Sequence, residues 1–222
     1  MNGRAYKSML YVGCVVGVYA GAAVASERGL DASRFSLVTI ALLIPAMVGA
    51  RAWFVVRHLD TYRPEPRRVM ARTEGGAGLF GGLVVAIIVS IPVLHLAALP
   101  FWTFWDAAAI TMLVGLLFTR FGCLMNGCCA GRATDSWLGM VLPNVTGERA
   151  RRYPTQLLEA GLAFVLLACA VAVRNAAPSG VVFVGVVTFY CAGRAPLQRL
   201  RSGDDSPRIW RSIVTRTEVT PV

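Results

Sequence analysis

Hydrophobic residues are concentrated in six long runs along the chain, and most of the charged residues lie in the segments between them. The runs cover residues 9–26, 35–56, 77–97, 101–120, 154–173 and 175–193. Each is close to the length of about 20 apolar residues that an α-helix needs to cross a bilayer. The short segments of alternating polarity that are typical of β-barrel strands are absent. The pattern therefore predicts an all-α fold, a polytopic transmembrane helical bundle with about six spans.

The composition agrees with this prediction. Of the 222 residues, 56% are hydrophobic and only 15% are charged, whereas a soluble domain carries about 25% charged residues. This balance excludes a disordered chain, a coiled coil and a typical cytosolic enzyme. We expect residues 1–201 to form one transmembrane helical domain and residues 202–222 to form a polar, basic tail.

Basic residues outnumber acidic ones by 22 to 12, and every basic residue except Lys7 is an arginine. They lie between the apolar runs rather than on one face of a soluble fold, so no nucleic-acid partner is expected. Because loops alternate sides across six spans, Arg28, Arg34 and Arg174 share one side and the remaining 19 share the other. Codon bias in a GC-rich gene and selection for phosphate binding explain the arginine excess equally well.

Five ionisable residues lie within or at the mouth of the apolar runs: Arg51, Asp106, Arg120, Glu159 and Arg194. Charges at such depth are costly, so they usually face the bundle interior and serve function. For Asp106, an ion pair that docks one helix against another is an equally good interpretation. Arg120 and Arg194 both end spans on the arginine-rich side, and we expect them to converge on a single lipid headgroup.

The densest motif follows the fourth run and reads RFGCLMNGCCAGRATDSW. Its glycines permit close approach to a ligand, its amide both donates and accepts hydrogen bonds, and its arginines can bind a phosphate ester. The residues concerned are Arg120, Gly122, Asn126, Gly127, Gly131 and Arg132. A glycine-rich turn that only packs helices together is the alternative.

The same motif contains Cys123, Cys128 and Cys129, which raises the question of a metal site. No CxxC pair is present, and the only histidines in the chain are His58 and His95. We therefore expect neither a metal ion nor a soluble cofactor.

A second motif, RRYPTQLLEA, opens the fifth run. Pro154 suits the first turn of a helix. Gln156 and Glu159 are three residues apart and so lie on one helical face. The motif contributes either to a ligand site or only to the start of the helix.

Taken in order, these motifs resemble those of the prolipoprotein diacylglyceryl transferases of bacterial inner membranes, over about residues 4–204. The positions that match the signature of that family are Arg120, Gly122, Asn126, Gly127, Gly131, Arg132, Thr134, Asp135 and Trp137. Further matches, in chain order, are Tyr6, Gly13, Gly17, Gly49, Ala50, Arg51, Asp106, Arg152, Pro154, Gln156, Leu157, Glu159, Gly193, Arg194 and Arg201. Cys123 and Cys128 replace a signature Asn and Glu, as in a GCC variant, and Phe80 replaces a histidine of the family.

The resemblance implies a multi-pass enzyme of the bacterial plasma (inner) membrane that uses no cofactor. It would transfer a diacylglyceryl group from phosphatidylglycerol to the lipobox cysteine thiol of a prolipoprotein, with a thioether and glycerol phosphate as products. Arg120 and Arg194 would stabilise the leaving group. Tyr6, Glu159 or Glu74 would serve as the base, or the arginines would lower the pKa of the acceptor thiol unaided. Substrate contacts are implied for Arg51, Gly122, Asn126, Gly127, Gly131, Arg132 and Gln156. We expect a monomer in contact with membrane lipids.

Three alternatives stay open at the level of the sequence. Phe80 favours a lipid-binding or chaperone-like relative without catalysis, and the cysteine replacements allow a lipid transferase with another acceptor. A small transporter would use the intramembrane charges, although no internal repeat supports it. The positive-inside rule places the arginine-rich side in the cytoplasm, whereas the resemblance implies an extracytoplasmic site, and we follow the resemblance.

Overall fold

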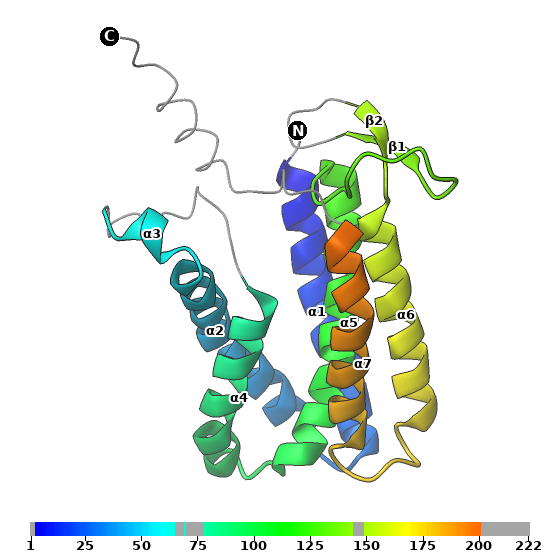
Figure 1. Ribbon diagram of the computed structural model, residues 1–222. Coiled ribbons are helices and arrows are strands. Elements are labelled where there is room, and N and C mark those ends of the chain that lie inside the picture. The colour runs from blue at the N-terminus through cyan, green and yellow to red at the C-terminus, as the bar shows by residue number, and fades with distance from the viewer. Residues whose placement is uncertain (1–2, 65–68, 70–77, 144–148, 201–222) are drawn as a thin grey trace. The chain divides into compact units, whose positions relative to one another are not determined.

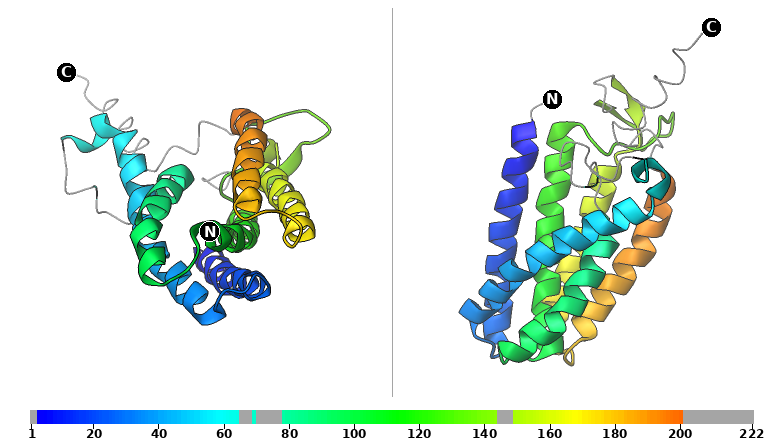
Figure 2. Two further views of the ribbon diagram at one scale, coloured as in Figure 1. Left: turned by 90° about the horizontal axis from the view of Figure 1, so that it is seen from below. Right: turned by 90° about the vertical axis from the view of Figure 1, so that its left-hand side faces the viewer.

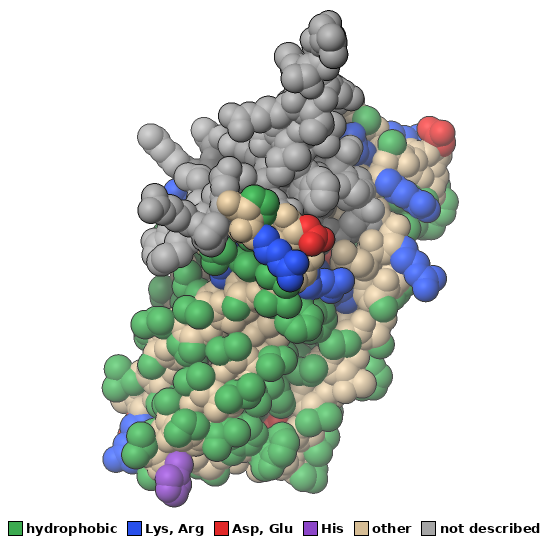
Figure 3. All heavy atoms as spheres, turned by 60° about the vertical axis from the view of Figure 1, so that its left-hand side comes forward, with side chains coloured by type: hydrophobic (Ala, Val, Ile, Leu, Met, Phe, Trp, Pro, Cys, Tyr) green, Lys and Arg blue, Asp and Glu red, His purple; other side chains and the backbone are tan. Residues whose placement is uncertain are grey.

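A computed structural model describes residues 3–64, 69, 78–143 and 149–200 of the chain. Within them, six helices are long and apolar enough to cross a membrane, which confirms the predicted all-α polytopic fold. These helices are α1 (Gly3–Glu27), α2 (Ala32–Val56), α4 (Leu79–Leu96), α5 (Phe101–Asn126), α6 (Thr155–Val173) and α7 (Val181–Leu200). On the face shown in Figure 3, hydrophobic side chains cover most of the helical surface, as contact with lipid requires. The tail predicted at 202–222 lies outside the described residues.

The described residues divide into two compact units, of which the first comprises 3–37 and 98–200. In this unit α5 contacts α1, α6 and α7, and α6 also contacts α7 (Figures 1 and 2). Small residues allow α1 to approach α5 closely. A Cβ atom on Gly13 would lie 2.6 Å from Cβ of Phe118, and one on Gly17 would lie 2.8 Å from the carbonyl oxygen of Thr111. Close helix packing through glycine is common in membranes, where lipid gives no hydrophobic drive for association.

The second unit contains most of α2, the single turn α3 (Leu59–Tyr62) and α4. Here too, glycines lie between the helices. A Cβ atom on Gly49 of α2 would lie 2.5 Å from Cβ of Val85 on α4, and Gly81 of α4 packs against Trp53 of α2. The unit therefore has an internal contact of its own between two spans.

The segment between α5 and α6 contains regular structure beyond the two predicted spans, 101–120 and 154–173. Helix α5 continues to Asn126, so Gly122 and Cys123 lie inside it. A two-stranded antiparallel sheet follows, in which β1 (Met140–Pro143) pairs with β2 (Arg149–Arg152) and Met140 lies opposite Arg152. The hairpin lies at the end of the first unit where α1 begins and α5 ends (Figure 1). Both strands have only four residues, and β2 reads RARR, so the signal is too short and, in β2, too polar for a strand to be predicted.

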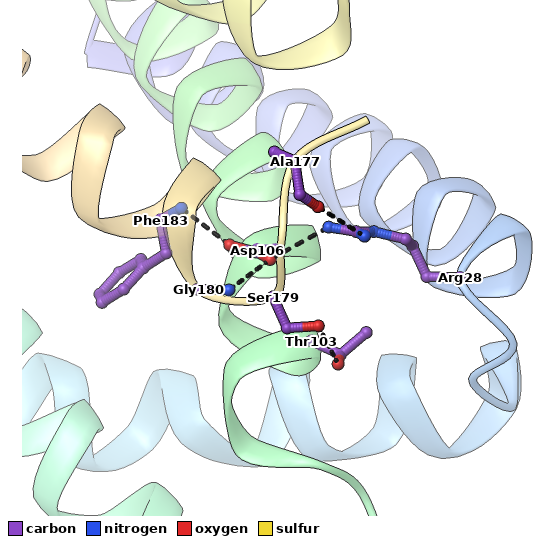
Figure 4. A network of polar contacts seen from close by, with 7 residues as sticks. All are labelled: Arg28, Thr103, Asp106, Ala177, Ser179, Gly180 and Phe183. Carbon is purple, nitrogen blue, oxygen red and sulfur yellow. Dashed lines mark hydrogen bonds and ion pairs between the residues drawn. The ribbon is translucent and has the colours of Figure 1, made fainter. Parts of the chain in front are cut away.

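The opposite end of the first unit is held by a buried ionic network around Asp106 (Figure 4). Its Oδ2 atom accepts hydrogen bonds from Nη2 of Arg28 at 3.2 Å and from the backbone N–H of Gly180 at 2.7 Å. Its Oδ1 atom accepts from the backbone N–H of Phe183 at 2.9 Å. The carboxylate therefore fixes the start of α7 and pairs with the arginine that follows α1. This is the ion pair between helices that the sequence allowed.

Candidate functional site

Arg120 and Arg194, which we expected to end spans, each lie six residues before the end of their helix and share one buried carboxylate. Oε2 of Glu159 on α6 forms ion pairs with Nη2 of Arg120 on α5 and with Nη1 of Arg194 on α7, the latter at 2.9 Å. The Glu159 side chain is 2% exposed, whereas those of Arg120 and Arg194 are 11% and 17% exposed. The cluster thus joins three helices at one point, with the carboxylate deepest.

Tyr190 is the fourth member of this cluster. It lies one helical turn before Arg194 on α7, and its hydroxyl accepts a hydrogen bond from Nη1 of that arginine at 3.1 Å. Two guanidinium groups and one carboxylate leave a net charge of +1 in a largely buried place. Electrostatic interactions are stronger there than in water, so the cluster attracts an anion.

The turn after α5 is fastened to the start of α6. Oγ1 of Thr155 donates a hydrogen bond to the carbonyl oxygen of Cys129 at 2.7 Å, and Nε2 of Gln156 donates to that of Cys128 at 2.8 Å. Gln156 and Glu159 are both buried, as their spacing on one helical face requires. The second motif therefore supplies both an anchor for the turn and the shared carboxylate.

At Gly122 and Gly131 the missing side chain allows close approach by other segments of this same chain. A Cβ atom on Gly122 would lie 3.0 Å from Cβ of Met9 on α1. A Cβ atom on Gly131 would lie 2.7 Å from Cβ of Tyr153 and 2.8 Å from the carbonyl oxygen of Leu200. Gly127 ends α5 with φ +66°, a left-handed conformation that glycine adopts without strain. These glycines shape the site through packing.

Arg132 is exposed and lies beside the hairpin. Its backbone N–H donates to the carbonyl oxygen of Leu200 at 2.9 Å, which ties the motif to the end of α7. Its guanidinium carbon is 5.9 Å from the centre of the Tyr153 ring. Hydrogen bonding, chiefly with Thr134, lowers the pKa of Tyr153 below its usual value. Arg132 therefore belongs to the rim of this end of the unit.

Tyr6 on α1 lies close to the thiols of the motif. Its hydroxyl is near enough to Arg120 and to Cys123, Cys128 and Cys129 to interact with them electrostatically. The first turns of α1 thus face the same end of α5 as the arginine–glutamate cluster does.

Other predicted residues lie in the second unit. Nε of Arg51 donates to the carbonyl oxygen of Val69 at 2.9 Å, and its guanidinium lies over the rings of Phe54 and Tyr62 at 5.7 and 5.4 Å. Phe80, at the position of the family's histidine, is 41% exposed. Glu74, a candidate base, lies outside the described residues.

Buried polar atoms without a hydrogen-bond partner mark the same end of the first unit. Among the described residues, Nε of Arg120, Oε1 of Gln156 and Oδ1 of Asn126 have no partner. Leaving such an atom unsatisfied costs about 1–3 kcal/mol. A donor and two acceptors are thus available to a ligand.

Sequence reasoning missed Tyr190 and Thr155. Tyr190 stands four residues before Arg194, a spacing that places both on one helical face and could have indicated the contact. Thr155 lies inside the motif quoted above, directly after the proline that precedes α6. Its bond to a backbone carbonyl 26 residues away carries no local signal.

The fold and the site together define a polytopic α-helical membrane protein with a buried cationic cluster at one end of its helices. The family model described as prolipoprotein diacylglyceryl transferase matches residues 1–220. The chain belongs to this family.

Curated relatives carry the name phosphatidylglycerol–prolipoprotein diacylglyceryl transferase. The one from Tropheryma whipplei (strain TW08/27) is 33% identical over 171 residues, covering 72% of this chain and 63% of the relative. The one from Geobacter sulfurreducens is 30% identical over 207 residues, covering 90% of this chain and 78% of the relative. The one from Shouchella clausii is 27% identical over 210 residues, covering 88% and 74%. This chain therefore spans less than two thirds of the Tropheryma relative.

Proposed function

We propose that this protein transfers the diacylglyceryl group of phosphatidylglycerol to the lipobox cysteine thiol of a prolipoprotein. The names of the relatives and the family match support this activity. The observation that carries it in the structure is the convergence of Arg120, the first residue of the signature motif, and Arg194 on Glu159.

The charge of this cluster fits the headgroup of the lipid substrate. Phosphatidylglycerol is a phosphodiester with a single negative charge, and the two guanidiniums and one carboxylate sum to +1. Arginine binds phosphate oxygens through parallel N–H donors, and Nε of Arg120 has no partner among the described residues. The bound lipid phosphate would therefore neutralise the cluster and complete the hydrogen bonding of Arg120.

The unsatisfied acceptors suggest how the glycerol headgroup is distinguished. Oε1 of Gln156 is buried without a partner among the described residues, while Nε2 is committed to the Cys128 carbonyl. A headgroup hydroxyl can donate to this oxygen. Phosphatidylglycerol carries two such hydroxyls, whereas the ammonium of phosphatidylethanolamine would face a cationic cluster. We infer that Gln156 contributes to headgroup selection.

The reaction balances without a cofactor. The acceptor sulfur attacks the carbon of the diacylglyceryl group that bears the phosphate ester oxygen, so a carbon–sulfur bond forms and a carbon–oxygen bond breaks. The electron pair leaves with glycerol phosphate, whose negative charge Arg120 and Arg194 stabilise as it develops. The thiol must first lose its proton. We assign a relay to Tyr6, whose hydroxyl accepts the proton from sulfur as it donates its own to an oxygen of the departing phosphate, so that glycerol phosphate leaves as the monoanion. Glu159 keeps both arginines in position, because its carboxylate oxygen accepts from each of them.

We place the protein in the bacterial plasma (inner) membrane as a monomer, with the arginine-rich end outside the cytoplasm, where lipobox cysteines are presented. The helices give the lipid a lateral path, since its acyl chains are already in the bilayer. The remaining motif residues that the resemblance implies as substrate contacts (Arg51, Gly122, Asn126, Gly127, Gly131 and Arg132) stay predictions.

The test is reconstitution with phosphatidylglycerol and a lipobox peptide, with the thioether product measured by mass spectrometry. Removing one donor to developing negative charge costs about 10²–10³-fold in rate, so we expect Arg120→Ala and Arg194→Ala to lose at least that much. Arg34→Ala is the matched control, because Arg34 is exposed at the other end of the first unit and its loss changes the net charge equally.

Two further measurements sharpen the result. Arg120→Lys keeps the charge without the paired donors, so it should recover only part of the activity. Replacing phosphatidylglycerol by phosphatidylethanolamine should abolish transfer in the unaltered protein. Lipid that binds without product would contradict the proposal and indicate a lipid-binding relative. Full activity of Arg120→Ala and Arg194→Ala would contradict the proposed role of these two arginines in binding the phosphate.

A further inference from the structure

Three cysteine thiols come together at the C-terminal end of α5. The Sγ atoms of Cys123, Cys128 and Cys129 all lie within 4.8 Å of one another, and all six cysteines of the chain are thiols in the structure. Cys123 is buried and the other two are partly buried. Within the described part of the chain, these three are the one cluster of His, Cys, Asp or Glu side chains with metal-binding spacing.

The backbone is held in an unusual conformation to bring them together. Gly127 has φ +66° and Cys129 has φ +63°, and a non-glycine residue in this region is disfavoured by about 1–2 kcal/mol. The surrounding bonds impose this shape, since Thr155 and Gln156 bind the carbonyl oxygens of Cys129 and Cys128. The sequence argument against a metal site rested on the missing CxxC pair and on His58 and His95 being the only histidines. The turn instead brings the thiols of the adjacent residues Cys128 and Cys129 close to that of Cys123, which lies in the last turns of α5.

The geometry suits a thiophilic ion. Zinc–sulfur bonds of about 2.3 Å place the sulfurs of a tetrahedral site about 3.8 Å apart, which small side-chain rotations can reach from the observed separations.

The charge selects the ion. Zn²⁺ with three thiolates has a net charge of −1, whereas Cu⁺ with the same ligands has −2. The neighbouring cluster of Arg120, Arg194 and Glu159 has +1, and Arg120 is near enough to Cys123 and Cys129 for electrostatic interaction. The less negative zinc complex therefore opposes a phosphate bound at the neighbouring cluster less than a copper complex would, and the charge favours Zn²⁺.

We propose that Cys123, Cys128 and Cys129 bind one Zn²⁺ ion as thiolates and leave its fourth position open. The three thiol protons pass to solvent on binding. The ion would fasten the signature turn to α5. This proposal does not depend on the assigned transferase activity, because the ligands and their placement are features of the turn alone.

Cobalt reports such a site directly. The full-length protein in detergent, kept reduced and treated with a chelator, is titrated with Co²⁺. We expect one Co²⁺ per chain, with a sulfur-to-cobalt charge-transfer band in the near ultraviolet and visible bands of tetrahedral coordination. Adding Zn²⁺ should displace the cobalt and remove these bands.

Ligand variants decide the assignment. Cys128→Ser and Cys129→Ser should each weaken Co²⁺ binding by more than the roughly 10–100-fold that follows loss of an outer-shell contact. Cys169→Ser is the control, because Cys169 is exposed on α6 and should keep the bands. Bound Zn²⁺ should also protect three thiols from alkylation in the unaltered protein. The absence of charge-transfer bands, or bands that survive both substitutions, would overturn the proposal.

Discussion

Asp106 offers the sharpest test of how a buried charge is assigned to structure or to function. Asp106→Ala removes the acceptor of two backbone N–H groups at the start of α7 and the partner of Arg28. The Asp106 and Arg28 side chains are 3% and 15% exposed, so the pair is largely desolvated. Breaking a buried pair by removing one partner costs about 3–5 kcal/mol, of which the lost helix cap accounts for about 1 kcal/mol.

For a chain of this size, 1 kcal/mol shifts the unfolding midpoint by about 2–4 °C. We therefore expect Asp106→Ala to lower the thermal unfolding midpoint by about 6–20 °C. The measurement is thermal unfolding of the protein in detergent, with tryptophan fluorescence as the signal. Asp106→Asn keeps one carbonyl oxygen and should fall between this variant and the unaltered protein. The control Arg34→Ala changes an exposed position, so its free energy of unfolding should stay within about 0.5 kcal/mol of that of the unaltered protein. An Asp106→Ala protein with an unchanged midpoint and no transferase activity would refute the structural assignment.

Three further predictions concern packing and the signature turn. Gly131→Ala should lower both the unfolding midpoint and transferase activity, because its Cβ atom would lie 2.8 Å from two carbonyl oxygens, whereas Gly161→Ala should change neither, since nothing lies within 4 Å. Gly17→Val should destabilise the contact of α1 with α5, where a Cβ atom meets the Thr111 carbonyl at 2.8 Å, and melting in detergent measures this. Gln156→Leu should raise the KM for phosphatidylglycerol. It should also release the turn after α5, which faster alkylation of Cys128 and Cys129 would report. An unchanged KM would show that Gln156 does not contact the headgroup.

The helices of this fold could be predicted because lipid imposes a simple requirement on sequence. A span must satisfy every backbone group internally and carry apolar side chains for about 20 residues, and all six spans follow that pattern. The end of α5 was placed six residues early, at 120, because glycine and cysteine interrupt the apolar run although Gly122 and Cys123 continue the helix. The β1–β2 hairpin lies outside the spans, so lipid imposes no such pattern on its sequence and it could not be predicted in this way.

The candidate site could be predicted to the extent that its two arginines lie near the ends of spans on the same side. This reasoning selected Arg120 and Arg194, and the motif at the start of α6 added Glu159. It gave no means of knowing that the carboxylate would lie between the two guanidiniums, because the distance between helices depends on packing along their whole length. The link from Gln156 to the carbonyl oxygen of Cys128 depends on the same packing.

The two ionic clusters at opposite ends of α5 show how such charges divide between structure and function. Asp106 and Arg120 are 14 residues apart, about 21 Å along the helix. Both oxygens of Asp106 accept from backbone N–H groups, which cannot leave without unwinding the start of α7. Oε2 of Glu159 accepts from the side chains of Arg120 and Arg194, which can rotate without unwinding a helix. We therefore infer that the carboxylate bound to backbone serves stability, whereas the proposed function uses the one shared by two arginines.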